Sequence, residues 1–244
     1  MPLEFPALMS KPLPAGEGFF DSLAQALLDC CSCEVATGDL WSVRVLVPAL
    51  PLAAEFRSAL LRVVPRPLLL PRFDTLTNWV QTASLDEAPE ILSESERLVL
   101  LHEALRERGW FDESALWGIA AEMAGLFDEL TSAAVQLPED ESGLTEQLQR
   151  AYNLRASEPL AFEARVVHDL WRALTTVGVP DAASAYQLRL AALARRVAAG
   201  KGKIQPLFVL LDAAPEESLD PAERDFLRRY GQTQALHIFH PAPR

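Results

Sequence analysis

The sequence predicts an α/β fold built on a parallel sheet. The stretch 41–48, WSVRVLVP, is a short apolar and β-branched run that ends at a proline. Near-continuous Val and Leu is typical of a strand covered on both faces, so we expect a buried strand at 43–47. Segments with helical spacing precede this strand at 19–33 and follow it at 52–64. The order helix, strand, helix indicates a sheet with helices on both faces.

Composition and charge narrow the class of protein. The chain has 244 residues, 50% of them hydrophobic and 23% charged, which suits one large α/β domain or two small ones. Its formal net charge of −12 argues against a free-standing nucleic-acid binder, because affinity for phosphates comes from clustered Lys and Arg. No apolar run reaches the ~20 residues of a membrane helix, and the N-terminus lacks the pattern of a signal peptide. We therefore expect a cytoplasmic protein without a membrane partner.

The cysteines and histidines do not predict a metal or catalytic centre. Cys30, Cys31 and Cys33 are the only cysteines and crowd into CCSC. A structural zinc site needs four ligands and no second ligand pair is present, so we predict free thiols in a reducing cytoplasm and no metal. The four histidines are scattered, and no GxSxG motif occurs. We predict that each histidine is a packing or surface residue.

The N-terminal segments predict a strand, a glycine loop and a helix. A short first strand is expected at 3–9, interrupted by Pro6, and a loop, KPLPAGEG, at 11–18. Nucleotide-binding proteins carry GxxxxGK[ST] in this place, where the lysine and the hydroxyl group serve phosphate and magnesium. Gly16 and Gly18 are present, but Phe19 and Phe20 follow in place of the lysine and the hydroxyl residue. The loop is either a phosphate-loop position without its chemistry or an ordinary turn.

The middle of the chain changes from sheet-forming to helical character. A second buried strand is expected at 68–70 and a helical turn at 75–82, capped by Asp74 or Thr75. From 93 to 199 the pattern is almost wholly helical and opens with a capping box of Ser93 and Glu96. Within it, Asp128 and Glu129 are interpreted as a solvated pair. Helices are expected around Leu98–Leu105 and at 113–136, 144–154, 160–177 and 182–197.

Sheet-forming composition returns near the C-terminus. A basic loop at 200–205, GKGKIQ, leads into a strand at 206–211. Asp212 follows at the carboxyl end of that strand, where α/β folds place ligand-binding groups. A helix at 220–229 and a strand at 235–239 complete the pattern. We therefore predict a core of 1–92 and 200–244, split by an inserted helical domain at 93–199.

This layout resembles the first motor domain of superfamily 1 helicases, which is P-loop NTPase-like. The ordered blocks GEGFFDSLAQALL, VRVLVPALPLAAEFRSALL, LLLPRFDTL, SESERLVLLHEAL and LFDELTSAAV are more particular. They resemble the N-terminal part of the B subunit of AddAB-type helicase-nucleases, in the branch whose phosphate loop has decayed. The resemblance implies a role in DNA repair and recombination, and a longer parent whose exonuclease activity lies in a C-terminal PD-(D/E)XK domain. We expect this chain to be an N-terminal piece that is not itself an enzyme.

The resemblance also implies site residues and partners. It places a degenerate Walker A loop at Gly16, Gly18 and Phe19, and a Walker B-like position at Asp212, which no second acid follows. Productive binding of ATP and Mg is therefore not expected, and no catalytic residue is assigned. The implied partners are the helicase-nuclease A subunit and DNA, either single-stranded or as a duplex end, in the parent complex.

DNA contact would need a modest basic strip with an aromatic side chain for base stacking. The alternative is that the arginines of such a strip are ordinary surface residues and the tryptophan belongs to the core. Two other functions stay open: an α/β nucleotide-binding enzyme that uses the Gly200 loop and Asp212, and a protein-docking adaptor. The residues predicted to form the strip are Arg66, Arg72, Trp79, Lys201 and Lys203.

Overall fold

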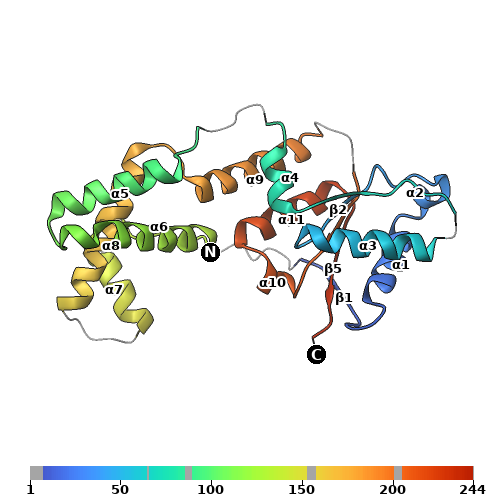
Figure 1. Ribbon diagram of the computed structural model, residues 1–244, viewed down its shortest axis with the longest axis horizontal. Helices are drawn as coiled ribbons and strands as arrows, with labels where there is room; N and C mark the ends of the chain where they lie inside the picture. The colour runs from blue at the N-terminus through green and yellow to red at the C-terminus, as the bar shows by residue number, and fades with distance from the viewer. Residues whose placement is uncertain (1–7, 65, 86–89, 153–157, 201–204, 244) are drawn as a thin grey trace. The chain divides into compact units, whose positions relative to one another are not determined.

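The protein is an α/β protein with a five-stranded, all-parallel sheet, as predicted. The computed structural model describes residues 8–64, 66–85, 90–152, 158–200 and 205–243. Its internal contacts divide the chain into a sheet unit, 1–86 and 188–244, and a helical unit, 87–187. The sequence predicts these boundaries at 93 and 199. Figure 1 shows the helices and strands of both units.

The order of the strands in the sheet is β1-β5-β4-β2-β3. The chain therefore runs in one direction across the sheet from β1 to β2 and β3, and then in the opposite direction through β4 and β5. Because crossovers between parallel strands are right-handed, this reversal places the connecting helices on opposite faces. The strands are β1 (Lys11–Leu13), β2 (Arg44–Leu46), β3 (Arg72–Asp74), β4 (Leu207–Leu210) and β5 (Leu236–Pro241).

One face of the sheet is covered by α1 (Phe19–Cys30) and α3 (Leu50–Val63). The predicted central strand is confirmed, since Val43, Val45 and Val47 are all buried. The helix predicted at 19–33 is interrupted at Cys31, after which α2 (Ser32–Thr37) begins. The core on this face comprises Leu23, Leu27, Val45, Phe56, Leu60, Phe208 and Phe239, among others.

The opposite layer of the sheet unit contains α4 (Leu76–Thr82), α11 (Pro221–Thr233) and the later part of α9 (Ala182–Ala198). Trp79 of α4 lies 5.6 and 5.9 Å, between ring centroids, from Phe226 and Tyr230 of α11. Arg189 of α9 donates hydrogen bonds to the carbonyls of Val80, Gln81 and Ala83 at the end of α4. The short helix α10 (Pro215–Ser218) lies between β4 and α11 in the chain.

The position of the first strand differs from the prediction. Residues 3–7 of the strand predicted at 3–9 lie outside the described residues, and β1 falls in the predicted loop. Pro12 is tolerated there because, among the described strands, β1 is at the edge and pairs with β5 alone, so no second described neighbour needs its missing N–H.

The strand predicted at 68–70 is also wrong in position. Only Leu69 pairs, in an isolated bridge with Asp39, and the strand itself is β3. Arg72 and Asp74 of β3 are polar, and Asp74 receives the guanidinium of Arg44 from the neighbouring strand. The polar composition of β3 is therefore balanced by a residue that is distant in the sequence.

The helical unit contains α5 (Glu94–Arg108), a 3-10 turn (Glu113–Ala115), α6 (Leu116–Ser132), α7 (Glu141–Tyr152), α8 (Glu158–Val177) and the start of α9. The predicted capping box at Ser93 and Glu96 is confirmed. The backbone N–H of Leu92 donates to the carbonyl of Pro180 at 2.9 Å, so the entry and exit of this unit lie side by side. No described helix is long and apolar enough to cross a bilayer.

Arg97, near the start of α5, is a buried cation of the helical unit. It reaches Asp128 at 2.7 Å and Asp181 at 3.1 Å, and it donates to the carbonyl of Ala124 at 3.0 Å. Asp128, interpreted as a solvated residue, has a side chain that is 48% exposed, and its carboxylate also pairs with this buried guanidinium. These contacts join the start of α5 to α6 and to the segment before α9.

Candidate functional site

The glycine loop between β1 and α1 is a tight helix entry. Gly16 and Gly18 have φ angles of 119° and 86°, in the region that favours glycine. No heavy atom lies within 4 Å of where a Cβ would stand at either position, so backbone conformation rather than crowding requires glycine. The N–H of Phe19 donates to the carbonyl of Gly16 at 3.1 Å, and the N–H of Ser22 donates to Gly18 at 2.9 Å. The loop thus uses its own backbone groups to start the helix.

The first turn of α1 carries aromatic rings and a carboxylate. Phe19 and Phe20 meet edge to face with ring centroids 5.4 Å apart, and both pack against the core. The carboxylate of Asp21 pairs with Arg62 at 2.5 Å. A phosphate loop presents a lysine ammonium and a hydroxyl group here, and the positive end of the helix dipole favours anions. Two rings and an acid cannot supply the charge that a triphosphate requires.

Asp212 follows β4 and is exposed. Its Oδ1 accepts a hydrogen bond from the hydroxyl of Ser218 at 2.6 Å, and that hydroxyl oxygen accepts the N–H of Ala213 at 2.9 Å. The carboxylate therefore closes the turn around α10. Because β5 lies between β1 and β4 in the sheet, Asp212 and the glycine loop follow strands that are not neighbours.

The reversal of strand order lies between β2 and β4, where α/β sheets place a ligand crevice at the carboxyl ends. The residues directly after β2 are Val47, Pro48 and Ala49, which carry no ionisable side chain. Residues 201–204 of the Gly200 loop lie outside the described residues. Asp212 follows the carboxyl end of β4, whereas Gly200 comes before its amino end in the chain.

The sequence matches no protein-family model and no curated protein. Function is therefore argued from the chemistry of the residues themselves.

Arg44 and Arg72 are register partners on β2 and β3, so both side chains point to the same face. The guanidinium of Arg44 pairs with Asp74 at 2.9 Å and lies 4.8 Å from the ring centroid of Trp79. Burial lowers the pKa of Arg44, and the neighbouring Arg72 cation lowers it further while Asp74 opposes both. Trp79 is thus packed between Arg44 and the rings of α11. Contact between Trp79 and DNA stays a prediction, but its ring is already engaged within the unit.

The remaining strip residues are placed differently. The guanidinium carbon of Arg72 lies 5.5 Å from the ring centroid of Trp41, which is 59% exposed. Arg66 donates to the carbonyl of Val35. Both arginines lie toward the amino edge of the sheet, because Arg72 begins β3 and Arg66 follows α3. Lys201 and Lys203 lie outside the described residues.

The predicted basic strip does not include Trp41, although its ring lies beside Arg72. In the sequence it opens the run WSVRV and resembles the first residue of a strand. Only the pairing of β2 with β3 brings its ring to Arg72. The result is an exposed aromatic ring beside a cation, which is the arrangement that stacks nucleic-acid bases in single-strand binders.

Tyr230 ties α11 to the loop before β4. Its hydroxyl donates to the carbonyl of Gln205 at 2.7 Å. Burial raises the pKa of Tyr230 to about 12, although the Arg44 cation opposes the shift. The phenol therefore stays protonated at neutral pH and acts as a hydrogen-bond donor.

The two described thiols differ in exposure, since Cys31 is buried and Cys30 is exposed. Burial, with the Glu34 carboxylate adding to it, raises the pKa of Cys31 to about 12. Burial also raises the pKa of Cys30. Because the thiolate is the nucleophile and metal ligand, the buried Cys31 is poorly suited to either role, whereas Cys30 stays accessible to a reagent. Within the described residues, no three His, Cys, Asp or Glu side chains are grouped to hold a metal.

A hollow of about 970 Å³ lies beside the edge strand β1. Lys11 of β1, Asp21 and Asp29 of α1, and His237 of β5 contribute to its lining. Burial lowers the pKa of His237, which favours the neutral ring. The charges in this hollow are mixed in sign and do not indicate one class of ligand.

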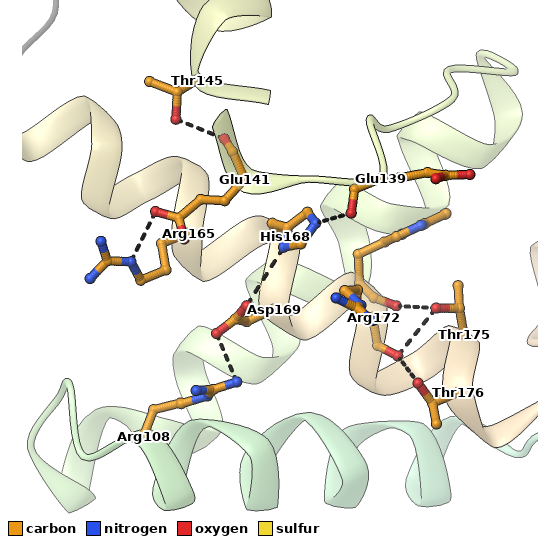
Figure 2. A network of polar contacts seen from close by, with 11 residues as sticks. Arg108, Glu139, Glu141, Thr145, Arg165, His168, Asp169, Arg172, Thr175 and Thr176 are labelled. Carbon is orange, nitrogen blue, oxygen red and sulfur yellow. Dashed lines mark hydrogen bonds and ion pairs between the residues drawn. The ribbon is translucent and has the colours of Figure 1, made fainter. Parts of the chain in front are cut away.

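The helical unit holds a second polar network, shown in Figure 2. The Nε2 atom of His168 lies 3.0 Å from the carbonyl of Glu139, and Nδ1 lies 3.6 Å from Asp169. Asp169 also pairs with Arg108 at 2.9 Å, and Arg165 pairs with Glu141 at 3.0 Å. These contacts join α5, α8 and the segment that leads into α7. The network holds these elements together and is not arranged as a catalytic triad.

Proposed function

We propose that this chain is a helicase-like α/β scaffold without ATPase activity, part of a helicase-nuclease of the AddAB type in DNA repair. It acts by binding a partner subunit, and DNA in the assembly, instead of by catalysis. The all-parallel sheet, the glycine loop after β1 and the helical unit inserted between β3 and β4 support the helicase-like part of this proposal. The observation that carries the inactive part is the first turn of α1, where the partly buried rings of Phe19 and Phe20 pack against the core.

The chemistry of that turn disfavours ATP for two reasons. A triphosphate that leaves water needs compensating charge, and the described residues of the turn offer none. Magnesium, which would bridge the phosphates, needs oxygen ligands, and the Oδ1 atom of Asp212 already accepts a hydrogen bond from Ser218. The two positions also follow non-neighbouring strands.

Calorimetric titration of the chain with ATP and Mg²⁺ tests the inactive scaffold. We expect no measurable heat of binding. Saturable binding with a micromolar dissociation constant would show that the loop still holds phosphate, and would overturn this part of the proposal.

Contact with single-stranded DNA is a second candidate activity, favoured by the exposed ring of Trp41 beside Arg72. Arg66 would add a phosphate contact at the same edge of the sheet. Fluorescence anisotropy of a labelled oligothymidine at low salt measures this binding. We expect Arg72→Ala and Trp41→Ala to weaken it, and Arg106→Ala in the helical unit to leave it unchanged. Equal affinities of the wild-type protein and the three variants for the oligothymidine would contradict the proposed contact with DNA.

The proposed protein partner is the helicase-nuclease A subunit. Co-purification of the two chains and sedimentation of the mixture test this assignment. A single co-sedimenting species supports it, whereas two independent species at micromolar concentration would contradict it.

A further inference from the structure

The negative charge of the protein is concentrated in the helical unit. Residues 87–187 include 19 acidic and 7 basic residues, so that they carry the whole formal net charge of −12. The residues of the sheet unit are balanced in charge. Several basic side chains of the helical unit already form ion pairs with acidic residues of the same unit, namely Arg97, Arg106 and Arg108. A partner of this unit is therefore expected to be basic.

One face of α6, which we call the α6 outer face, points to solvent and is apolar at its centre. Gly118, Ala121 and Gly125 form its middle, and all three are exposed. Trp117 borders the face on the side of α5, and its ring stacks on His102 of that helix with centroids 4.1 Å apart. The opposite border is acidic, and it consists of Glu122 and Glu129.

The two glycines of this face are not required by the fold of the chain. Glycine inside a helix lowers stability relative to alanine. Neither Gly118 nor Gly125 has a positive φ, and no atom lies within 4 Å of where a Cβ would stand at either position. Alanine would therefore fit at both places without a clash. A flat helix surface of this kind becomes useful when a second helix approaches closely.

The border toward α5 supplies an aromatic anchor. Trp117 is 53% exposed, and its stacking on His102 fixes the ring in one orientation. Val99 of α5, one turn before His102, is 47% exposed. Tryptophan is the residue type most enriched among binding hot spots, and a fixed ring loses little entropy on binding. An exposed tryptophan, an exposed valine and a glycine-flattened helix thus share one surface.

We propose that the α6 outer face, with Val99 and Trp117, binds an amphipathic basic helix of a protein partner. The apolar side of such a helix would cover Trp117 and the Gly118–Gly125 surface, and its Lys or Arg residues would meet Glu122 and Glu129. A second copy of this chain is a poor occupant, because the same acidic border would face itself. Nucleic acid is repelled by the same carboxylates.

This inference deepens the partner-binding role proposed above and names the surface that performs it. It uses only residues of the helical unit. ATP binding at the glycine loop would therefore overturn the inactive scaffold and leave this surface untouched.

The test uses the full chain and a labelled 18-residue peptide with leucines on one helical face and lysines on the other. Fluorescence anisotropy at 0.1 M salt gives the dissociation constant. A peptide of the same composition in scrambled order, which has no apolar face, is the control for simple charge attraction. We expect saturable binding of the first peptide and at least roughly tenfold weaker binding of the second.

Two variants on the face and one outside it complete the design. We expect Trp117→Ser to weaken binding by roughly tenfold or more, because it removes the anchor. The double variant Gly118→Ala/Gly125→Ala keeps the helix and fills the surface, so we expect weaker binding from a protein that is no less stable. Trp41→Ser removes a comparably exposed tryptophan from the sheet unit and is expected to change nothing.

Three results would overturn the proposal: equal affinity for the two peptides, equal affinity of the wild-type and Trp117→Ser proteins, or no binding of either peptide. Sedimentation of the chain alone tests whether a second copy of the chain binds to this face. Self-association that is lost in Trp117→Ser would show a second copy on this face, against the proposal.

Discussion

Replacing Arg97 with methionine measures how much one buried cation contributes to the helical unit. Methionine keeps most of the apolar stem and removes only the guanidinium. The side chain of Arg97 is 7% exposed and that of its partner Asp181 is 11% exposed. The substitution therefore leaves a buried carboxylate without its counter-charge.

The expected loss follows from the three contacts. Breaking a buried pair by removing one member costs about 3–5 kcal/mol. The contact with Asp128, whose side chain is 48% exposed, contributes only about 0–1 kcal/mol, and the lost bond to the Ala124 carbonyl contributes about 1 kcal/mol. We expect Arg97→Met to lower the free energy of unfolding by at least about 4 kcal/mol, a large share of the ~5–15 kcal/mol of a typical domain.

Urea denaturation followed by circular dichroism measures the loss. With a slope of about 2 kcal/mol per molar urea, the midpoint should fall by roughly 2 M. The matched control is Arg106→Met on the same helix, whose pair with Glu103 is exposed and should cost less than about 0.5 kcal/mol. Adding Asp181→Asn to Arg97→Met removes the stranded charge and keeps the cap on Ser184, so part of the stability should return. Equal losses in the Arg97 and Arg106 variants would refute the reasoning.

Three further predictions concern other parts of the chain. The pKa of Tyr230 in the folded state is about 12, above the usual ~10, so its contribution to stability is complete below about pH 10 and is lost as pH rises toward 12. Tyr230→Phe should therefore remove this contribution to the fall in the free energy of unfolding with pH, measured in urea titrations. An unchanged fall would contradict the assignment. Gly118→Ala and Gly125→Ala should each raise the free energy of unfolding by about 1 kcal/mol, and a loss in either would show a steric requirement that the structure lacks. With a thiol-specific chromogenic reagent at pH 8, Cys30→Ser should reduce the fast-reacting thiols of the folded protein and Cys31→Ser should not; the reverse order would show that Cys31 is accessible.

The elements that the sequence predicted correctly are those with local signals. The strand around Val45 is a continuous β-branched run, and the entry to α5 is marked by Ser93 and Glu96 three residues apart. The strands β1 and β3 were missed because their signals are not local. Pro12 is acceptable only at the edge of the sheet, and Asp74 is acceptable in a strand because Arg44 reaches it from the neighbouring strand.

In the candidate site, too, the features with a local signal could be predicted from the sequence and the others could not. The missing lysine at Phe19 could be seen directly in the sequence, whereas the packing of its ring against the core needed the structure. Arg97, Asp128 and Asp181 lie far apart in the chain, and no spacing rule joins them. Trp41 and Arg72 likewise meet only because their strands pair.

The hydrogen bond from Leu92 to Pro180 has a consequence for how the chain folds. The sheet must pair β2 with β4, although the whole helical unit lies between them in the sequence. Closing a long flexible loop is slow, and contacts between helices close in sequence form earlier. Once the helical unit has formed and its two ends have joined, the chain from β3 to β4 behaves as a much shorter connection. Early folding of the helical unit then brings the C-terminal strands β4 and β5 close to the N-terminal strands, so that they can complete the sheet.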